Sequence, residues 1–320
     1  MKDYNKLLCL LLFIPFLLLG CNKDDDTKQD DPLPAKKEFS FIEITLSDYY
    51  NLDITPISID FNDDKIYIAD EDMDISIFDE DYTYLGLVET EGGANIYAHT
   101  IRHRHQNGFF IYNQEYNYMM RYDEDCHRVC EINNLPDLDN DFICAIDVDN
   151  LDNVFMIYDH NTIHKYDYDF NGPLASATNI GDLFEHGNYP FEIMSICVDN
   201  NQNVYIAIDV DDENGEGYDA VLQFDNQLNF MRHLGGDSTF NGPCGIAFDN
   251  ANNMYVVNRW QCTVRVFNTA FEQVAISGPL NSPGAQHGRL DEPIGIRINN
   301  NRVYITERKN HRVSVFSAYN

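Results

Sequence analysis

A segment of similar pattern occurs six times along the chain, and this repeat constrains the fold more than any other feature. Each copy places an isoleucine in a short run of alternating apolar and polar residues, followed by a turn rich in Asn and Asp and then a second run. The six isoleucines are Ile59, Ile101, Ile146, Ile196, Ile246 and Ile296. The first two intervals are 42 and 45 residues, and the last three are 50. Periods of this length are typical of repeat architectures.

Each repeat carries the signals of four antiparallel strands. Alternation with a period of two, broken by Asn, Asp and Gly, favours strands joined by tight turns. About twenty residues after each isoleucine a third run carries an aromatic residue near its end, as in ISIFD (75–79) and VRVFN (264–268), and a weaker fourth run follows. The six repeats therefore predict an all-β, six-bladed β-propeller with four-stranded antiparallel blades.

One strand at the start of the domain has no partner in its own repeat. The last repeat stops after its third strand, whereas the segment EFSFIEITL (38–46) precedes the first repeat. We expect this N-terminal strand to close the last blade as its outermost member, because an open sheet edge invites unwanted pairing. The propeller domain then comprises residues 39–320.

The fifth and sixth repeats, PCGIAFDNANNMYVV (243–257) and PIGIRINNNRVYI (293–305), resemble the NHL repeat family. The resemblance covers residues 39–320 and is best in the last four repeats, whereas the second lacks the Pro and Gly before its isoleucine. It implies that the isoleucine strands are innermost and that the residue two before each isoleucine lies at the mouth of the central channel. Those residues are Ile57, His99, Cys144, Met194, Cys244 and Ile294.

This predicted ring is largely apolar, and we interpret His99, Cys144, Met194 and Cys244 as candidate ligand-binding residues. The resembled family includes a zinc-dependent peptide-amidating lyase, and related propellers include calcium-dependent lactonases. A metal-assisted lyase or hydrolase at the channel is therefore an alternative function. The ring offers one histidine where the lyase pattern has three, and it offers no acid. The sequence leans away from an enzyme for that reason.

An insertion in the fourth repeat, DVDDENGEGYD (209–219), is a weak calcium candidate. Asp209, Asp211 and Glu213 alternate like the oxygen ligands of an EF-hand loop. The Gly comes one position late and no Glu occupies the twelfth position, so a solvated loop is the other interpretation. No other cofactor is indicated.

Charge is distributed unevenly along the chain. Residues 131–225 hold 21 acids and one base, whereas residues 259–312 hold eight bases and four acids. The rim loops expected in the basic part carry Arg259, Trp260, His287, Arg289, Arg308 and Lys309. Trp and Arg contribute strongly to interfaces, so this sector is a candidate site for a glycan, a peptide or a protein partner, unless these are unrelated rim residues. A net charge of −32 argues against nucleic acid.

The N-terminus has the pattern of an export signal. Lys2 and Lys6 precede an apolar stretch, and the sequence Leu18-Leu19-Gly20-Cys21 resembles a bacterial lipobox. This resemblance implies a signal peptide over 1–20 and lipidation of Cys21. Residues 21–38 then comprise the lipidated Cys and a flexible acidic linker, which begins with Asn22–Asp26, a run that resembles the surface tag of Bacteroidota lipoproteins.

We therefore expect a lipid-anchored outer-membrane protein, exposed on the cell surface. The leading prediction is a propeller that binds a ligand or partner on its loop-rich rim. A structural subunit of an outer-membrane complex is a further alternative.

Overall fold

The computed structural model describes residues 41–45, 55–62, 64–71, 75–88, 98–103, 108–113, 118–123, 127–132, 143–185, 187, 189–211, 217–236, 239–277, 283–286 and 288–319. The chain divides into two units, Met1–Leu33 and Pro34–Asn320, and all described residues belong to the second. The predicted signal peptide, Cys21 and the linker lie outside the described residues. Within the described part, no helix is long and apolar enough to cross a membrane.

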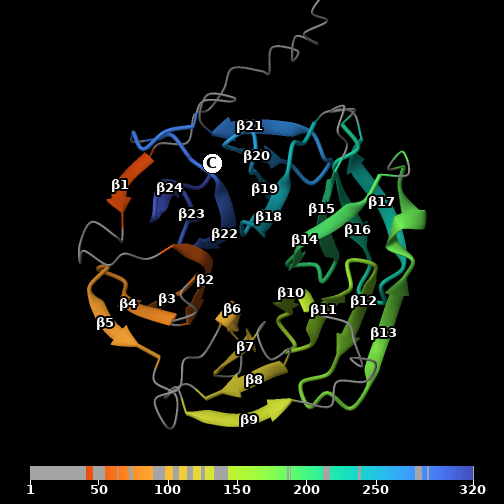
Figure 1. Cartoon of the computed structure of the whole chain (residues 1–320), viewed down its shortest axis with the longest axis horizontal. Helices are drawn as coiled ribbons and strands as arrows, with labels where there is room; N and C mark the ends of the chain where they lie inside the picture. The colour runs from red at the N-terminus through yellow and green to blue at the C-terminus, as the bar shows by residue number, and fades with distance from the viewer. Residues whose placement is uncertain are drawn as a thin grey trace, which may run out of the picture. The chain divides into compact units, whose positions relative to one another are not determined.

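Six four-stranded antiparallel sheets make up the second unit and surround a common centre (Figure 1). From the inside outwards, the first three are β2 (Pro56–Asn62), β3 (Lys65–Asp70), β4 (Ile75–Asp79) and β5 (Tyr84–Leu87); β6 (Ala98–His103), β7 (Phe109–Asn113), β8 (Tyr118–Tyr122) and β9 (Arg128–Ile132); and β10 (Ile143–Val148), β11 (Val154–Tyr158), β12 (Thr162–Tyr166) and β13 (Pro173–Thr178).

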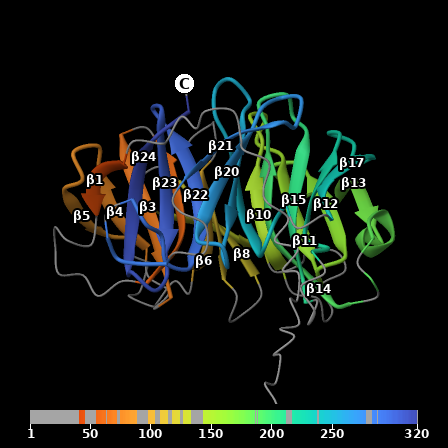
Figure 2. The ribbon, with the colours of Figure 1, turned by 90° about the horizontal axis from the view of Figure 1, so that it is seen from above.

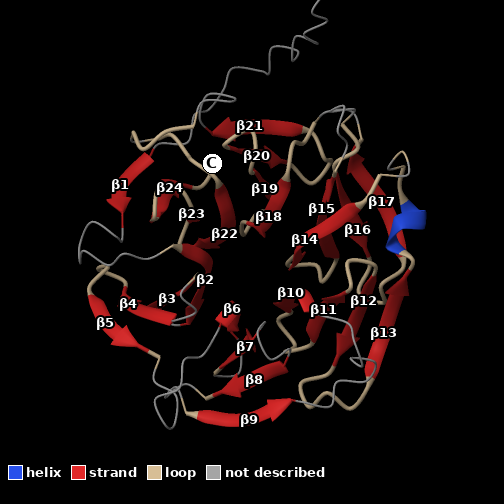
Figure 3. Ribbon diagram, in the orientation of Figure 1, coloured by secondary structure: helices blue, strands red, loops and turns tan. Residues whose placement is uncertain are grey.

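The next two sheets are β14 (Phe191–Val198), β15 (Val204–Val210), β16 (Ala220–Phe224) and β17 (Phe230–Gly235); and β18 (Pro243–Phe248), β19 (Met254–Asn258), β20 (Thr263–Phe267) and β21 (Gln273–Ser277). The sixth contains β22 (Pro293–Asn299), β23 (Arg302–Glu307) and β24 (Arg312–Ser317), with β1 (Phe41–Thr45) on its outer edge. The described residues hold no α-helix, only the 3-10 turn η1 (Ile180–Leu183) (Figure 3). The six-bladed propeller is thus confirmed, and Figure 2 shows its sheets from the side.

The repeated isoleucines hold neighbouring blades together. All six lie on innermost strands and are at most 4% exposed. Ile59 packs in a cluster that includes Tyr304 of the sixth sheet, and Ile246 packs in one that includes Tyr205 of the fourth. Full burial of an isoleucine side chain contributes about 1.5–3 kcal/mol. The sequence period is therefore the period of the interfaces between blades.

An aspartate side chain fixes the turn after the innermost strand in the third, fourth and fifth sheets. Asp249 Oδ1 accepts the backbone N–H groups of Ala251 (2.9 Å) and Asn253 (2.8 Å), and Asn253 Nδ2 donates to Asp249 Oδ2 (2.8 Å). Asp149 and Asp199 make the same set of bonds in their own turns. These are Asx turns, in which the side chain mimics a backbone turn. Part of the acidity of the chain therefore has a structural role.

Strand β1 pairs antiparallel with β24, with Phe41 opposite Phe316. Only the backbone of β1 is described, so closure of the ring by this strand stays a prediction.

Deletion of residues 1–46 tests that closure. The deletion leaves the outer edge of β24 unpaired. We expect the melting temperature to fall by more than about 5 °C. In a domain of this size, 1 kcal/mol of unfolding free energy shifts the melting temperature by about 2–4 °C, so this fall corresponds to roughly 2 kcal/mol lost with the strand. Deletion of residues 1–37, which keeps the strand, is the control in the same calorimetric measurement. Equal melting temperatures for the two truncated chains would show that β1 does not close the ring.

Candidate functional site

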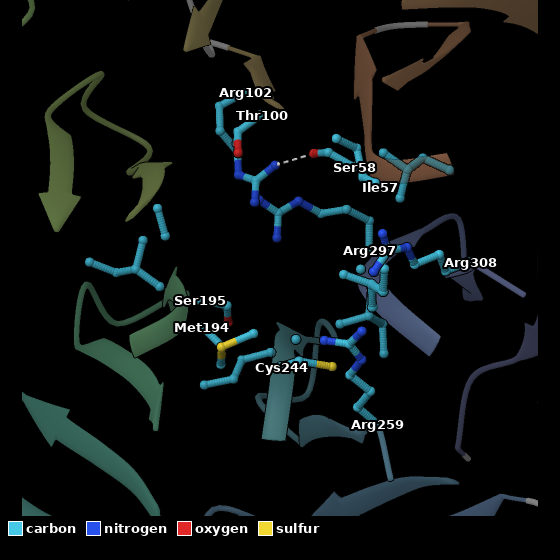
Figure 4. A pocket seen from close by; sticks show the side chains of 18 of the residues that line it. Ile57, Ser58, Thr100, Arg102, Met194, Ser195, Cys244, Arg259, Arg297 and Arg308 are labelled. Carbon is cyan, nitrogen blue, oxygen red and sulfur yellow. Dashed lines mark hydrogen bonds between the residues drawn. The ribbon is translucent and has the colours of Figure 1, made fainter. Parts of the chain in front are cut away.

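The innermost strands enclose a cavity of about 510 Å³ on the central axis, which we call the axial cavity (Figure 4). Every innermost strand has a β-bulge where it borders the cavity. At the bulge, its pairing register with the next strand of the same sheet shifts. Bulges break the alternation of a strand and re-aim a side chain. The residues skipped by the pairing include the whole ring expected at the channel mouth: Ile57, His99, Cys144, Met194, Cys244 and Ile294.

Four residues of that ring, Ile57, Met194, Cys244 and Ile294, line the axial cavity. The side chains of His99 and Cys144 lie outside the described residues, although their backbones belong to β6 and β10. The wall of the cavity is therefore mainly aliphatic at this level. The binding role of the ring stays a prediction.

A ring of small residues lies at or directly after the bulges and makes room on the axis. Its members all line the cavity and are Ser58, Thr100, Ala145, Ser195, Gly245 and Gly295. A Cβ atom on Gly245 would lie 2.7 Å from the carbonyl oxygen of Ile294, so this glycine lets the fifth and sixth sheets approach closely. The hydroxyl of Ser195 is buried without a hydrogen-bond partner among the described residues. Small side chains thus provide both the space and an unused polar group.

Two arginines, Arg102 and Arg297, form the inner end of the cavity, and we call them and their partners Asp60 and Asp147 the floor cluster. Asp147 Oδ1 lies 3.1 Å from Arg102 Nε and 2.8 Å from Arg297 Nη2, and Asp60 Oδ1 lies 3.4 Å from Arg297 Nε. These side chains are at most 14% exposed. Arg102 and Arg297 also line a second cavity, of about 410 Å³, together with both aspartates. The floor cluster therefore separates two cavities on the axis.

The members of the floor cluster hold each other in the charged state. Burial and the charge of Arg297 lower the pKa of Arg102 to about 10, which leaves the guanidinium protonated at neutral pH. Burial opposes ionisation of Asp60, but interactions with His103 and Arg297 hold the pKa of this carboxyl far below its usual range. Arg297 pairs with both aspartates, so its removal would leave a buried unpaired charge at Asp60 and cost about 3–5 kcal/mol.

The floor cluster was missed by the sequence analysis, although a signal for it exists. Each member comes directly after a repeat isoleucine, where the fourth and fifth repeats have Cys197 and Ala247. Residues one before and one after the isoleucine share a strand face. Alignment of the six repeats at the residue directly after the isoleucine would have shown two acids and two arginines facing one channel.

Three of the six rim residues predicted to converge lie around a single carboxylate. Arg259 forms an ion pair with Glu292, Arg308 Nη1 lies 3.7 Å from Glu292 and Lys309 Nζ lies 4.0 Å from it. Burial works to raise the pKa of Glu292, but the hydrogen bond from Arg259 and the three positive charges lower it below its usual range. Arg308 also pairs with Glu71 of the first sheet. Because Arg308 is 44% exposed and lines the axial cavity, the cavity reaches solvent at this end.

Trp260 joins this rim sector through two contacts. The guanidinium carbon of Arg259 lies 4.6 Å from the centroid of the Trp260 ring, a cation–π contact. Burial together with the charge of Asp219 raises the pKa of Asp209 to about 6, whereas interaction with the indole of Trp260 lowers it. Trp260 remains 52% exposed. Asp209, predicted as a calcium ligand, therefore has an indole partner at the rim.

The described contacts do not connect the other predicted site residues to this group around Glu292. Asp211 is exposed, and the backbone carbonyl of Arg289 accepts a hydrogen bond from Arg312 Nη2 (2.7 Å). Glu213 and His287 lie outside the described residues. Across the described ranges, no three His, Cys, Asp or Glu side chains are grouped so as to hold a metal ion. Calcium binding stays an untested prediction.

The cysteine of the cavity wall behaves as an apolar residue. Cys197, Cys244 and Cys262 are free and buried. Burial raises the pKa of the Cys244 thiol, whose Sγ lies 3.2 Å from the carbonyl oxygen of Pro293. A protonated buried thiol packs like a small hydrophobic group.

Residues 290–316 match the sequence model of the NHL repeat, which agrees with the resemblance noted in the last repeat. No curated protein matches the chain in sequence.

Solved structures of similar fold include enzymes and binding proteins. Virginiamycin B lyase from Staphylococcus aureus has 14% identity and a TM-score of 0.56, and the match covers 88% of this chain and 100% of the lyase. A Bacteroides thetaiotaomicron protein described as of unknown function has 12% identity and a TM-score of 0.61 over 88% of this chain and 72% of its own. An auxiliary nutrient binding protein from the same species has 14% identity and a TM-score of 0.54 over 82% and 68%. The TM-scores show a shared fold, and at identities this low the likeness shows the fold alone.

The raised pKa of Asp209 predicts a pH-dependent signal from Trp260, the one tryptophan of the chain. As the pH falls through about 6, protonation of Asp209 removes the negative charge beside the indole, so the fluorescence of Trp260 should titrate with a midpoint near 6. Asp209→Asn should abolish the transition, whereas Asp211→Asn, on an exposed neighbour, should retain it. A titration that persists unchanged in Asp209→Asn would refute the assignment.

Proposed function

We propose that the chain is an exported lipoprotein, anchored at the outer membrane through Cys21 and exposed on the cell surface, whose propeller binds a small ligand in the axial cavity. The observation that carries this proposal is the cavity itself, to which all six innermost strands contribute small residues. A volume of about 510 Å³ lies within the range typical of small-molecule sites.

The lining of the cavity supports ligand binding. Its wall is aliphatic around Ile57, Met194 and Ile294. Its polar groups are a few hydroxyls, Glu71 and four arginines. Apolar walls with a few placed polar groups are typical of ligand sites. Arg259 links the cavity to the exposed Trp260, so part of the predicted rim sector would form the entrance.

Similar folds are compatible with this role. One similar structure carries the name of a nutrient binding protein, and it and another come from Bacteroides thetaiotaomicron. These likenesses support a binding propeller and agree with the Bacteroidota type indicated by the N-terminal segment.

A cavity-filling substitution tests ligand binding. Ser195→Phe places a ring in the axial cavity, whereas Thr178→Phe places the same ring on the exposed outer strand β13. We expect fragments from a chemically diverse panel to bind the wild-type protein and Thr178→Phe but not Ser195→Phe, as measured by ligand-observed NMR. Melting curves check that both variants are folded. If every fragment that binds the wild-type protein also binds folded Ser195→Phe equally well, the axial cavity is not the site.

Substitution of the lipidated residue tests the anchor. In bacteria that process lipoproteins, wild-type chain should incorporate a labelled fatty acid, and Cys21→Ser should not, because the thiol is the acceptor. Cys9→Ser, within the expected signal peptide, is the matched control and should be labelled. Equal labelling of Cys21→Ser and wild type would contradict lipidation at this residue.

A further inference from the structure

We propose that the ligand of the axial cavity is an amphiphilic carboxylate, with an apolar body against the aliphatic wall and its carboxylate on Arg102 and Arg297. This proposal rests on the proposed function, because it concerns the same cavity. It assigns the chemical class of the ligand and the direction in which the ligand enters.

The two floor guanidinium groups retain unused donors. Arg102 Nη1 donates to the carbonyl oxygen of Ile101 (2.6 Å) and to Ser58 Oγ (3.2 Å), and its Nε lies near Asp147 without a hydrogen bond. Arg297 directs Nε and Nη2 at the two aspartates. No acceptor for Arg102 Nη2 or Arg297 Nη1 occurs among the described residues. Figure 4 shows both guanidinium groups reaching into the cavity.

The carboxylates of the floor cluster are turned away from the axial cavity. Asp147 Oδ2 accepts the backbone N–H of Val198 (2.8 Å), and Asp60 Oδ2 accepts that of His103 (2.6 Å). Both aspartates line the second cavity and neither lines the first. The floor cluster is neutral as a whole, but it presents its positive side to the axial cavity.

The charges on the cavity lining have one predominant sign. Its charged residues are Glu71 and four arginines, Arg102, Arg259, Arg297 and Arg308. The net charge of −32 belongs mostly to distant groups, which salt screens beyond about 8 Å at physiological ionic strength. Every one of these arginines has an acidic partner, but Glu71 is the one such acid that lines the cavity. The cavity surface therefore presents mainly guanidinium groups, which favours a negative ligand group there.

A carboxylate satisfies these donors better than a neutral oxygen does. It accepts at two oxygens, which fits two guanidinium groups held side by side, and charge-assisted hydrogen bonds of this kind are roughly twice as strong as neutral ones. The hydroxyl of Ser195 is a further unused donor on the same wall. Around these donors the wall is aliphatic, which requires an apolar ligand body and keeps water away from the ion pair.

Three ligands with the same eight-carbon chain but different head groups separate the effect of charge on binding affinity from that of apolar contact, in the wild-type protein. We expect octanoate to bind at least about tenfold more tightly than octanol in isothermal titration calorimetry, and octylammonium to bind most weakly. Equal affinity for octanoate and octanol, a preference for octylammonium, or no binding of any of the three would overturn the proposal.

Arg102→Gln tests the floor directly, and its design avoids an unpaired aspartate. Asp147 keeps Arg297 and the N–H of Val198 as partners, whereas a substitution of Arg297 would leave Asp60 without its arginine partner. We expect about tenfold weaker binding of octanoate and unchanged binding of octanol. Arg121→Gln, on β8 and outside the cavity lining, is the control and should change neither. Wild-type octanoate affinity in folded Arg102→Gln would overturn the assignment.

Failure of this proposal is distinguishable from failure of the proposed function. If fragments or octanol bind the wild-type protein and are lost in Ser195→Phe while octanoate has no advantage, the axial cavity is a ligand site of another chemistry. If octanoate binds folded Ser195→Phe as well as wild type, neither proposal holds for this cavity.

Discussion

The floor cluster is the interaction on which the centre of the propeller depends. Its four charges come from the first, second, third and sixth sheets, yet Asp147 reaches two arginines within about 3 Å. Buried charges are tolerated only when they are paired with good geometry. The innermost strands must therefore stand at a fixed distance and height, and the blade interfaces around the repeat isoleucines have to supply that precision. The cluster divides the axis into two cavities and gives the axial cavity a positive inner end.

The bulge in each innermost strand connects sequence, fold and site. It lets one residue in each of five blades, and two in the sixth, leave the sheet alternation, and a small residue at or after the bulge leaves free volume on the axis. The bulges of the six innermost strands together thereby produce one cavity. A rigid ring of this kind places donors from separate blades around one point without the cost of ordering a loop, which favours recognition by preorganisation.

Much of the fold was predictable because a period of about 50 residues and a strand alternation of two are local properties of the sequence. Ile57, Met194, Cys244 and Ile294 were expected at the channel and line the cavity. The resemblance supplied that expectation, but the bulge that explains it is not visible in residue types. The contact between Asp209 and Trp260 was not predictable, because it joins strand β15 of the fourth sheet to a turn of the fifth. Arg102 and Arg297 were predictable in principle, since repeat alignment places both on the channel face.

The most direct measurement of the central claim is the location of a carboxylate ligand in crystals of the protein. We predict that octanoate brominated at its far end gives an anomalous bromine peak in the axial cavity on the side of Arg259 and Arg308, with carboxylate density on Arg102 and Arg297. A bromine peak against the floor cluster would mean the reverse orientation. Bromine only on the outer strands, or an empty axial cavity in crystals saturated with the ligand, would contradict the account.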